Sequence, residues 1–418
     1  MSSQSTVKKA LEKESLREQE FGYLDAEAAA RVLAEERAKT WPDTGTDIQP
    51  KPRSRMVRWV LASVLVALIL LAIGALWFAH AYFRENTAII NPAVQYERSV
   101  AVRDGLHNTN TDLIYWRGAF HLVHATAPAG LSAGESRLVL RRSTDTGDWE
   151  TAAEFRASQG SGIRKASFAA VGSRLFLYAA MATAPFREST FMSYTEDGNN
   201  WSALVEIAPI GTVVGRPKTR DGLTWYSAAH SPGTGVTTLL RTDDGLAWEE
   251  ISEVYQGGAQ EPEIEFLADG RMLVLVAVRT GGSPFSDRGH TVIATAFPPY
   301  TSWETNRVWN MPLESPCLFR YKGDIYAVAG IPLRANNRIS NALGRRRTEI
   351  YRVQPGAIEW ITDLPSGGDT AGAAIVVQGD QAFGSYYSSD VSRDWPQFLG
   401  EMLPTEIHSV EIDLTSLM

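Results

Sequence analysis

The order of apolar and polar residues divides the chain into three parts. Residues 59–79 contain no charged side chain, and at about 1.5 Å per residue they would form a helix about as long as a ~30 Å bilayer core. Charged, helix-forming residues precede this run, and short apolar segments separated by turns follow it. We therefore predict a charged helical segment with a linker over residues 1–58, a transmembrane helix over 59–83 and a β-rich domain over 84–418.

The charges beside the apolar run predict its orientation. Lys51, Arg53, Arg55 and Arg58 precede it, whereas one arginine and one glutamate follow it. Because positive residues stay in the cytoplasm, we expect a single-pass protein in the lipid bilayer, with a cytoplasmic N-terminus and the β-rich domain in the periplasm or outside the cell. A cleaved signal peptide is the alternative, but its apolar core is usually about 7–15 residues long and lies near residue 1.

The segment before the membrane run is nearly neutral. Its mixed charges and helix formers favour one or two solvated helices that could dock a protein partner. A loosely ordered tail remains an equal alternative. Residues 41–52, rich in Pro, Gly and Asp, are expected to be a linker into the membrane.

Six apolar hairpins recur after residue 100. Each has a glycine in its turn, and these glycines are about 50 residues apart: Gly118, Gly172, Gly222, Gly270, Gly323 and Gly379. A period near 50 with about four strands per unit is typical of a β-propeller, so we predict an all-β domain with six blades. The alternative fold, two β-sandwiches, would not predict such a regular spacing of hairpins. Residues 405–414 should pair near 91–102 and close the ring.

A second repeat places acidic residues and a tryptophan in turns. The stretches are "RRSTDTGDWE" (141–150), "SYTEDGNNWS" (193–202) and "LRTDDGLAWEEI" (240–251). In the last of these, Asp243, Gly245 and Trp248 are expected to form the turn. The aspartate can bond its own backbone while the tryptophan packs beneath, so we interpret these acids as turn formers and not as catalytic groups.

Composition excludes several classes of function. The net charge is −8, which argues against nucleic acid as a partner. The single cysteine, Cys317, excludes an intrachain disulfide framework and a cysteine-rich metal site. His121 and His124 lie three apart on a predicted strand and would face opposite sides, so they make no metal pair. We predict no metal and no cofactor.

The repeats carry a resemblance to a known family. Asp-turns on a six-blade period, with the segments 107–125, 260–279 and 367–389, resemble sialidase-like (Asp-box, or BNR-repeat) propellers grouped with bacterial exo-sialidases. The resemblance covers the domain after residue 90. It implies a six-bladed propeller that binds an acidic sugar or glycan, with glycoside hydrolase activity as the chemistry of the class.

Candidate site residues lie where the first strand of each blade begins, at the top of the central channel. The resemblance implies a tyrosine nucleophile paired with a glutamate, an aspartate as acid and base, and arginines that hold a carboxylate. The segment 260–279 matches the family at Glu261 and Arg279. We therefore predict as catalytic Glu261, Asp112, Asp369, Tyr386 and Tyr387. We predict as substrate-binding Arg216, Arg279, Arg164, His107 and Asn108.

The catalytic pattern of the family is incomplete in this chain. Arg103 is followed by Asp-Gly where the family has Ile-Pro, Arg164 by Lys-Ala where the bacterial relatives have Asp-Pro, and "GGDT" by Ala-Gly where a tyrosine is expected. The sequence therefore leaves a second hypothesis open. In it the propeller is a non-catalytic scaffold or accessory subunit that binds a protein partner in a membrane complex.

Overall fold

The computed structural model describes residues 30–35, 53–130, 136–156, 162–184, 187–208, 211–279, 289–333 and 342–418. The chain divides into two compact units, Met1–Gly74 and Ala75–Met418. In the first, residues 30–35 are helical and exposed, and the rest of the predicted helical segment before residue 53 lies outside the described residues. Helix α3 (Arg53–Phe83) begins in this unit, and Met56–Phe83 is long and apolar enough to cross a membrane.

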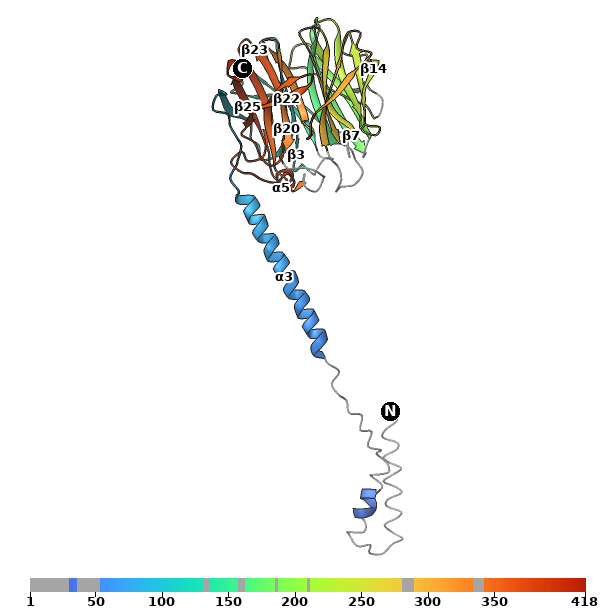
Figure 1. The fold of residues 1–418 in the computed structure, drawn as a ribbon, viewed down its shortest axis with the longest axis vertical. Helices are drawn as coiled ribbons and strands as arrows, with labels where there is room; N and C mark the ends of the chain where they lie inside the picture. The colour runs from blue at the N-terminus through green and yellow to red at the C-terminus, as the bar shows by residue number, and fades with distance from the viewer. Residues whose placement is uncertain are drawn as a thin grey trace. The chain divides into compact units, whose positions relative to one another are not determined.

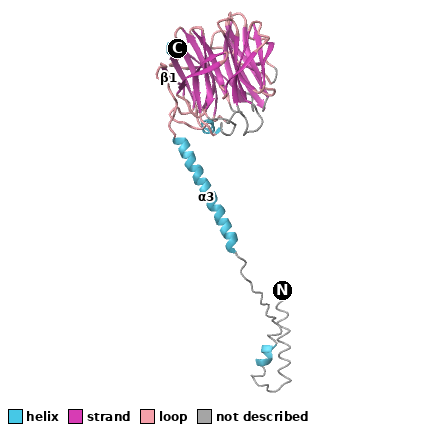
Figure 2. Cartoon of the chain, viewed as in Figure 1, coloured by secondary structure: helices cyan, strands magenta, loops and turns pink. Residues whose placement is uncertain are grey.

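The second unit is the predicted six-bladed propeller, in which strands form almost all of the regular structure (Figures 1 and 2). Four consecutive strands form each of the first two antiparallel blades. Blade 1 contains β2 (His107–Trp116), β3 (Ala119–Ala127), β4 (Arg137–Ser143) and β5 (Glu150–Arg156). Blade 2 contains β6 (Gly162–Val171), β7 (Arg174–Ala184), β8 (Arg187–Thr195) and β9 (Val205–Glu206).

The third blade begins with a broken strand. It contains β10 (Val213–Val214), β11 (Lys218–Thr219), β12 (Trp225–Ser231), β13 (Val236–Thr242) and β14 (Glu249–Gln256). Blade 4 contains β15 (Ala259–Phe266), β16 (Met272–Arg279), β17 (Gly289–Ala296) and β18 (Glu304–Trp309). Blade 5 contains β19 (Glu314–Tyr321), β20 (Asp324–Pro332), β21 (Arg346–Gln354) and β22 (Ala357–Leu364).

The last blade joins both ends of the propeller. It contains β23 (Thr370–Gln378), β24 (Gln381–Ser388), β25 (Glu406–Asp413) and β1 (Tyr96–Val102), in the order β1-β25-β24-β23. Tyr96 pairs with Ile412, which confirms the predicted closure. Helix α5 (Gln397–Met402) lies between β24 and β25 in the chain, at one end of the propeller, and a short 3₁₀ helix (Leu414–Leu417) ends the chain (Figure 1).

The apolar core lies between neighbouring blades. One cluster packs Tyr326 and Ile350 of blade 5 against Tyr386 and Val410 of blade 6, and another packs Leu122 of blade 1 against blade 6. Similar clusters join the other adjacent blades. Each sheet therefore buries both faces against its neighbours.

The first strands of five blades carry an irregularity at a similar place, close to the start of each strand. The pairing register shifts after Thr109, Ile163, Gln260, Glu314 and Ala371. Three of the residues at these shifts, Asn110, Glu261 and Ser315, have positive φ although they are not glycine. Bulges of this kind redirect side chains and often lie next to functional sites.

The acidic residues of the turns bond their own backbone, as predicted. In the turn at Thr242, the Asp244 carboxylate accepts from the N–H groups of Leu246 and Ala247 at 2.8 and 3.0 Å. The turn acid is therefore Asp244, and the prediction of Asp243 was wrong by one residue. The cause is Thr242, whose hydroxyl bonds Asp244 and accepts from the N–H of Gly245.

Among the described residues of the propeller, the same arrangement occurs four times with identical spacing. A hydroxyl residue, an acid two positions later and a tryptophan four positions after the acid recur in each turn: Ser143, Asp145 and Trp149; Thr195, Asp197 and Trp201; Thr219, Asp221 and Trp225; Thr242, Asp244 and Trp248. The residue after the acid has positive φ in all four turns. It is glycine in three of them and Thr146 in the first.

The first of these turns offers a test of backbone strain. Thr146→Gly is expected to stabilise the propeller by roughly 0.5–1 kcal/mol, because threonine at a φ of 66° carries a steric cost that glycine lacks. Thermal unfolding of the two proteins measures the change. Gly245→Ala is the matched control and should destabilise, since its Cβ would lie 3.0 Å from the Phe176 ring. A lower unfolding temperature for Thr146→Gly would contradict this account.

Candidate functional site

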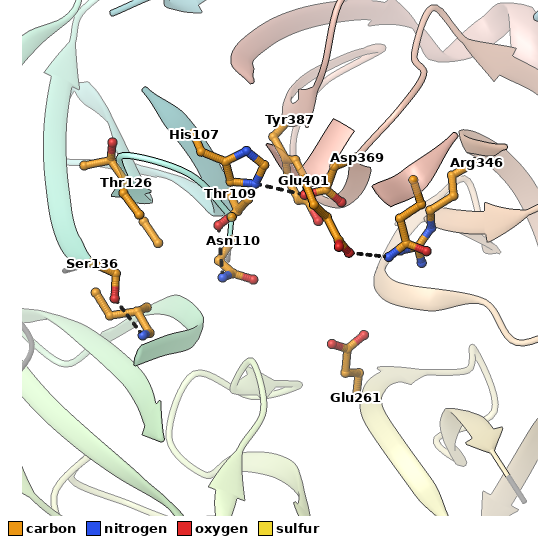
Figure 3. A pocket seen from close by; sticks show the side chains of 15 residues that line it. His107, Thr109, Asn110, Thr126, Ser136, Glu261, Arg346, Asp369, Tyr387 and Glu401 are labelled. Carbon is orange, nitrogen blue, oxygen red and sulfur yellow. Dashed lines mark hydrogen bonds and ion pairs between the residues drawn. The ribbon is translucent and has the colours of Figure 1, made fainter. Parts of the chain in front are cut away.

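A pocket of about 440 Å³ opens where the first strands of several blades begin (Figure 3). Four predicted site residues, His107, Glu261, Asp369 and Tyr387, line it. Polar residues that sequence reasoning did not select complete the wall: Thr109, Asn110, Thr126, Ser136, Arg346, Gln397 and Glu401. Glu261 lies across the pocket from His107 and Asp369 (Figure 3).

His107 and Asp369 form a buried pair on one wall. The Nε2 atom of His107 lies 3.0 Å from Asp369 Oδ2, and its Nδ1 atom lies 2.8 Å from the carbonyl oxygen of Leu403. Both ring nitrogens thus face acceptors, which favours the doubly protonated imidazolium over either neutral tautomer. Burial opposes the charge on His107, but the hydrogen bond and charge of Asp369 outweigh it and raise the pKa of His107. This pair can therefore supply a proton.

Helix α5 places a second acid beside this pair. Glu401 Oε1 accepts a hydrogen bond of 2.7 Å from the side-chain amide of Gln397, one turn earlier on the same helix. Burial and the nearby charge of Asp369 raise the pKa of Glu401. The backbone carbonyl of Glu401 also accepts from the N–H of Gly130, which joins α5 to blade 1 at 2.9 Å.

Glu261 is the acid on the opposite wall. It occupies the bulge of β15 at a φ of 46°, and its Oε2 accepts from the backbone N–H and the hydroxyl of Ser315 at 2.6 and 2.8 Å. These two donors fix the position of the carboxylate. A bulge at such a φ costs stability, and residues of this kind cluster at functional sites.

The structure separates the two predicted tyrosines. Tyr387 lines the pocket, and burial followed by the charge of Asp369 raises its pKa well above the usual value, so its phenol stays neutral. Tyr386 is fully buried in the core between blades 5 and 6 and donates to the carbonyl of Pro365 at 2.9 Å. Adjacent strand residues face opposite sides, which places only one of them at the pocket.

Two arginines converge on one carboxylate at the edge of the site. Arg279, at the end of β16, and Arg346, at the start of β21, both form ion pairs with Glu314. Arg346 also lines the pocket. One carboxylate thus pairs with two guanidinium groups, so this cluster keeps a net positive charge at the edge of the pocket.

Arg216 and Asp112 lie deeper, in the central channel. Arg216 Nη2 lies 2.6 Å from Asp112 Oδ1, and Nη1 lies 2.9 Å from Glu263 Oε1. The other oxygen of Asp112 accepts from the N–H of Phe168 at 2.6 Å. This network joins blades 1, 2, 3 and 4. Arg216 and Glu261 also line a cavity of about 30 Å³, so Glu261 lines both this cavity and the 440 Å³ pocket.

Two further predicted residues lie elsewhere. Asn108 is buried, and its side-chain amide donates to the Thr405 carbonyl at 3.0 Å and to Asp104 Oδ1 at 2.8 Å. Asn108 therefore joins β2 to the segment just before β25. Arg164 lies in β6, but its side chain is outside the described part of the structure.

Within the described ranges, no group of three or more His, Cys, Asp or Glu side chains is arranged to hold a metal ion. The acids around the pocket instead form hydrogen bonds: Asp369 with His107, Glu261 with Ser315 and Glu401 with Gln397.

The fold is similar to those of several solved structures. Trypanosoma rangeli sialidase in complex with sialic acid matches with a TM-score of 0.54 and 13% identity, over 80% of this chain and 58% of that one. A Hadza microbial sialidase matches with a TM-score of 0.55 and 14% identity, over 75% and 66%. A protein of unknown function from Dyadobacter fermentans matches with a TM-score of 0.56 and 14% identity, over 77% and 100%.

These similarities show the fold. The chain spans about three fifths of the length of the trypanosomal sialidase. No family model and no curated protein sequence matches the chain.

Proposed function

We propose that the propeller binds a glycan in the 440 Å³ pocket and hydrolyses a glycosidic bond there. The observation that carries the proposal is the placement of acids on opposite walls, with Glu261 facing Asp369 and His107 (Figure 3). Glycoside hydrolysis commonly uses two carboxyl groups that flank the bond, one holding a proton and one ionised. The resemblance to sialidase propellers supports the same class of ligand.

Each acid has an environment that suits one role. The Asp369–His107 pair holds an additional proton and would donate it to the leaving oxygen, and Glu401 lies beside it. Glu261 would act from the other face, directly or through Tyr387, whose neutral phenol lies in the same pocket. An acidic group on the glycan would have to share Arg346 with Glu314, because that ion pair already occupies the guanidinium.

We further propose that Met56–Phe83 spans the membrane, with the N-terminus in the cytoplasm. The span would hold the propeller at the bilayer surface in the periplasm or outside the cell. Retention of the full chain in membranes washed with alkaline carbonate tests this part separately.

Substitution of Glu261 tests the catalytic proposal. With the full chain in neutral detergent, Glu261→Gln and Asp369→Asn are each expected to lower turnover of fluorogenic neutral and acidic glycosides by about 10²–10⁴-fold, because each removes a group that transfers a proton or attacks. Binding of the same glycans, measured by calorimetry, should weaken much less. Glu359→Gln, an exposed acid on β22, is the matched control.

The outcomes separate the parts of the proposal. Binding by the wild type without turnover of any glycoside would remove hydrolysis and leave a glycan-binding propeller. Absence of both binding and turnover would remove the proposal as a whole.

A further inference from the structure

A second cavity, of about 200 Å³, lies in the propeller unit beside the last turns of α3. Space of this size holds about six water molecules, at roughly 30 Å³ each. It shares no lining residue with the 440 Å³ pocket. The lining residues come from the end of α3, from the segment before β21 and from the segment before α5: Trp77, His80, Ala81, Arg84, Leu343, Gly344, Arg345, Asp394 and Pro396.

The polar wall of this cavity has more positive than negative charge. Asp394 is fully buried, and its two oxygens lie 2.5 Å from Arg345 Nη1 and 2.5 Å from Arg347 Nη2. Arg84 Nε lies 3.5 Å from the same carboxylate. One carboxylate thus forms ion pairs with three guanidinium groups. The Thr87 hydroxyl also donates a hydrogen bond of 2.9 Å to this carboxylate.

The arginines differ in their access to the cavity. Arg347 is fully buried behind Asp394 and also feels the charges of Glu349 and Asp363. Arg84 and Arg345 line the cavity, and their side chains remain 40% and 18% exposed. These two guanidinium groups, with His80 nearby, can therefore accept another anion. Guanidinium groups suit phosphate in particular, because their N–H donors match its oxygens.

Apolar side chains at the cavity and next to it suit the surface of a bilayer, and of these Trp77 and Leu343 line the cavity itself. The Trp77 ring stacks on Phe398 with centroids 6.0 Å apart, and Tyr82 stacks on Trp395 at 5.4 Å. Leu343 and Phe83 remain 52% and 65% exposed. Trp and Tyr rings are enriched where a membrane helix leaves the hydrocarbon, and these residues lie at the end of the apolar helix Met56–Phe83.

We propose that this cavity binds the phosphate of an anionic phospholipid in the leaflet next to the propeller. The two arginines contact the phosphate, and the acyl chains run along the apolar residues of α3. The inference rests on the proposed membrane span but not on glycan hydrolysis. It gives Arg84, Arg345 and Asp394 a function that the propeller fold alone does not require.

Thermal unfolding of the full chain in neutral detergent tests this site. Phosphatidylglycerol in the micelles should raise the unfolding temperature more than an equal mole fraction of phosphatidylcholine, since a ligand that binds only the folded state stabilises it by mass action. Arg84→Gln should weaken the apparent affinity for phosphatidylglycerol by roughly tenfold, the effect of losing one charge-assisted hydrogen bond. Arg345→Gln should do the same, but it also removes a partner of buried Asp394 and can lower stability by itself.

One further variant serves as a control for the lipid experiment. Arg393→Gln is the matched control, because Arg393 lies next to Asp394 in the chain and does not line the cavity. It should retain the wild-type response. Equal effects of the two lipids, or an unchanged response in Arg84→Gln, would overturn the proposal. Inorganic phosphate that reproduced the full stabilisation would assign the cavity to a free anion and overturn the lipid assignment.

The glycan and membrane tests stay distinct from this one. If the chain remains in carbonate-washed membranes but its unfolding temperature does not respond to phosphatidylglycerol, the proposed membrane span stands and the proposed lipid site is wrong. Turnover of glycosides by Arg84→Gln should equal that of the wild type, because Arg84 lies outside the 440 Å³ pocket.

Discussion

Arg216→Met is expected to lower the free energy of unfolding of the propeller by about 3–5 kcal/mol. The guanidinium lies between Asp112 and Glu263, whose side chains are 1% and 0% exposed. Removal of Arg216 leaves two buried carboxylates close together without their counter-charge. Thermal and urea unfolding of the wild type and the variant measure the loss.

A neutral network should restore most of this stability. The triple variant Arg216→Met, Asp112→Asn, Glu263→Gln removes all three charges, and buried ion pairs replaced by neutral groups of similar size often cost little. Arg352→Met is the matched control: its partner is Asp324, both side chains are more than a third exposed, and the expected loss is under about 1 kcal/mol. A loss of that small size for Arg216→Met would show that the channel network contributes little.

The free energy of unfolding is expected to fall as the pH decreases from about 6.5 to 4. Burial is the main cause that lowers the pKa of four histidines, to about 4 for His121 and His230 and to about 3 for His124 and His408. In the unfolded chain each returns to about 6.5, so the unfolded state binds more protons in this range. Arginine donors also hold two of these rings neutral: Arg141 to His124 and Arg98 to His408.

Other groups oppose this trend but do not reverse it. Burial raises the pKa of Glu349 to about 7, so the folded state binds one proton more there between about pH 7 and 4.5. His107 has a raised pKa, and its contribution is present below about pH 6.5 and lost as the pH rises through its folded value. The four histidines less Glu349 leave roughly three protons in excess on the unfolded chain near pH 5.5, which corresponds to about 4 kcal/mol per pH unit.

Urea unfolding at constant ionic strength between pH 7 and 4.5 measures this dependence. His124→Gln should reduce the slope by about one proton, because it removes one of the four titrating rings. A flat profile across the range would contradict the proposed role of the buried histidines.

The sequence predicted the propeller because each blade repeats a local pattern. Turn glycines such as Gly118 and Gly323 have positive φ in the structure, and the tryptophan turns of blades 1 to 3 share one internal spacing. Closure of the ring by β1 and β25 could also be predicted, since the strands at the two ends had no other partner. The one-residue error at Asp243 arose because the turn begins at Thr242 and not at Arg241.

The site was less predictable because it depends on contacts between blades. Arg346 begins the third strand of its blade, and Glu401 lies on a helix outside the repeat, so no repeat pattern marked either residue. Arg216 stands before a first strand like the other candidates, but the broken start of blade 3 directs it toward Asp112. The tyrosines differ only by strand alternation, and the register of β24 decides which one reaches the pocket.

The pairing of β1 with β25 has a consequence for synthesis of the chain. β1 emerges first among the strands, and its partner β25 emerges about 300 residues later, which at about 5–20 residues per second means a wait of roughly 15–60 seconds. During this time the edge of β1 is open to wrong partners. The first half of β1 carries the charged residues Glu97 and Arg98, which disfavour pairing with other chains while the seam stays open. The ring therefore closes only after β25 has been made, and products that end before β25 are left with an open seam.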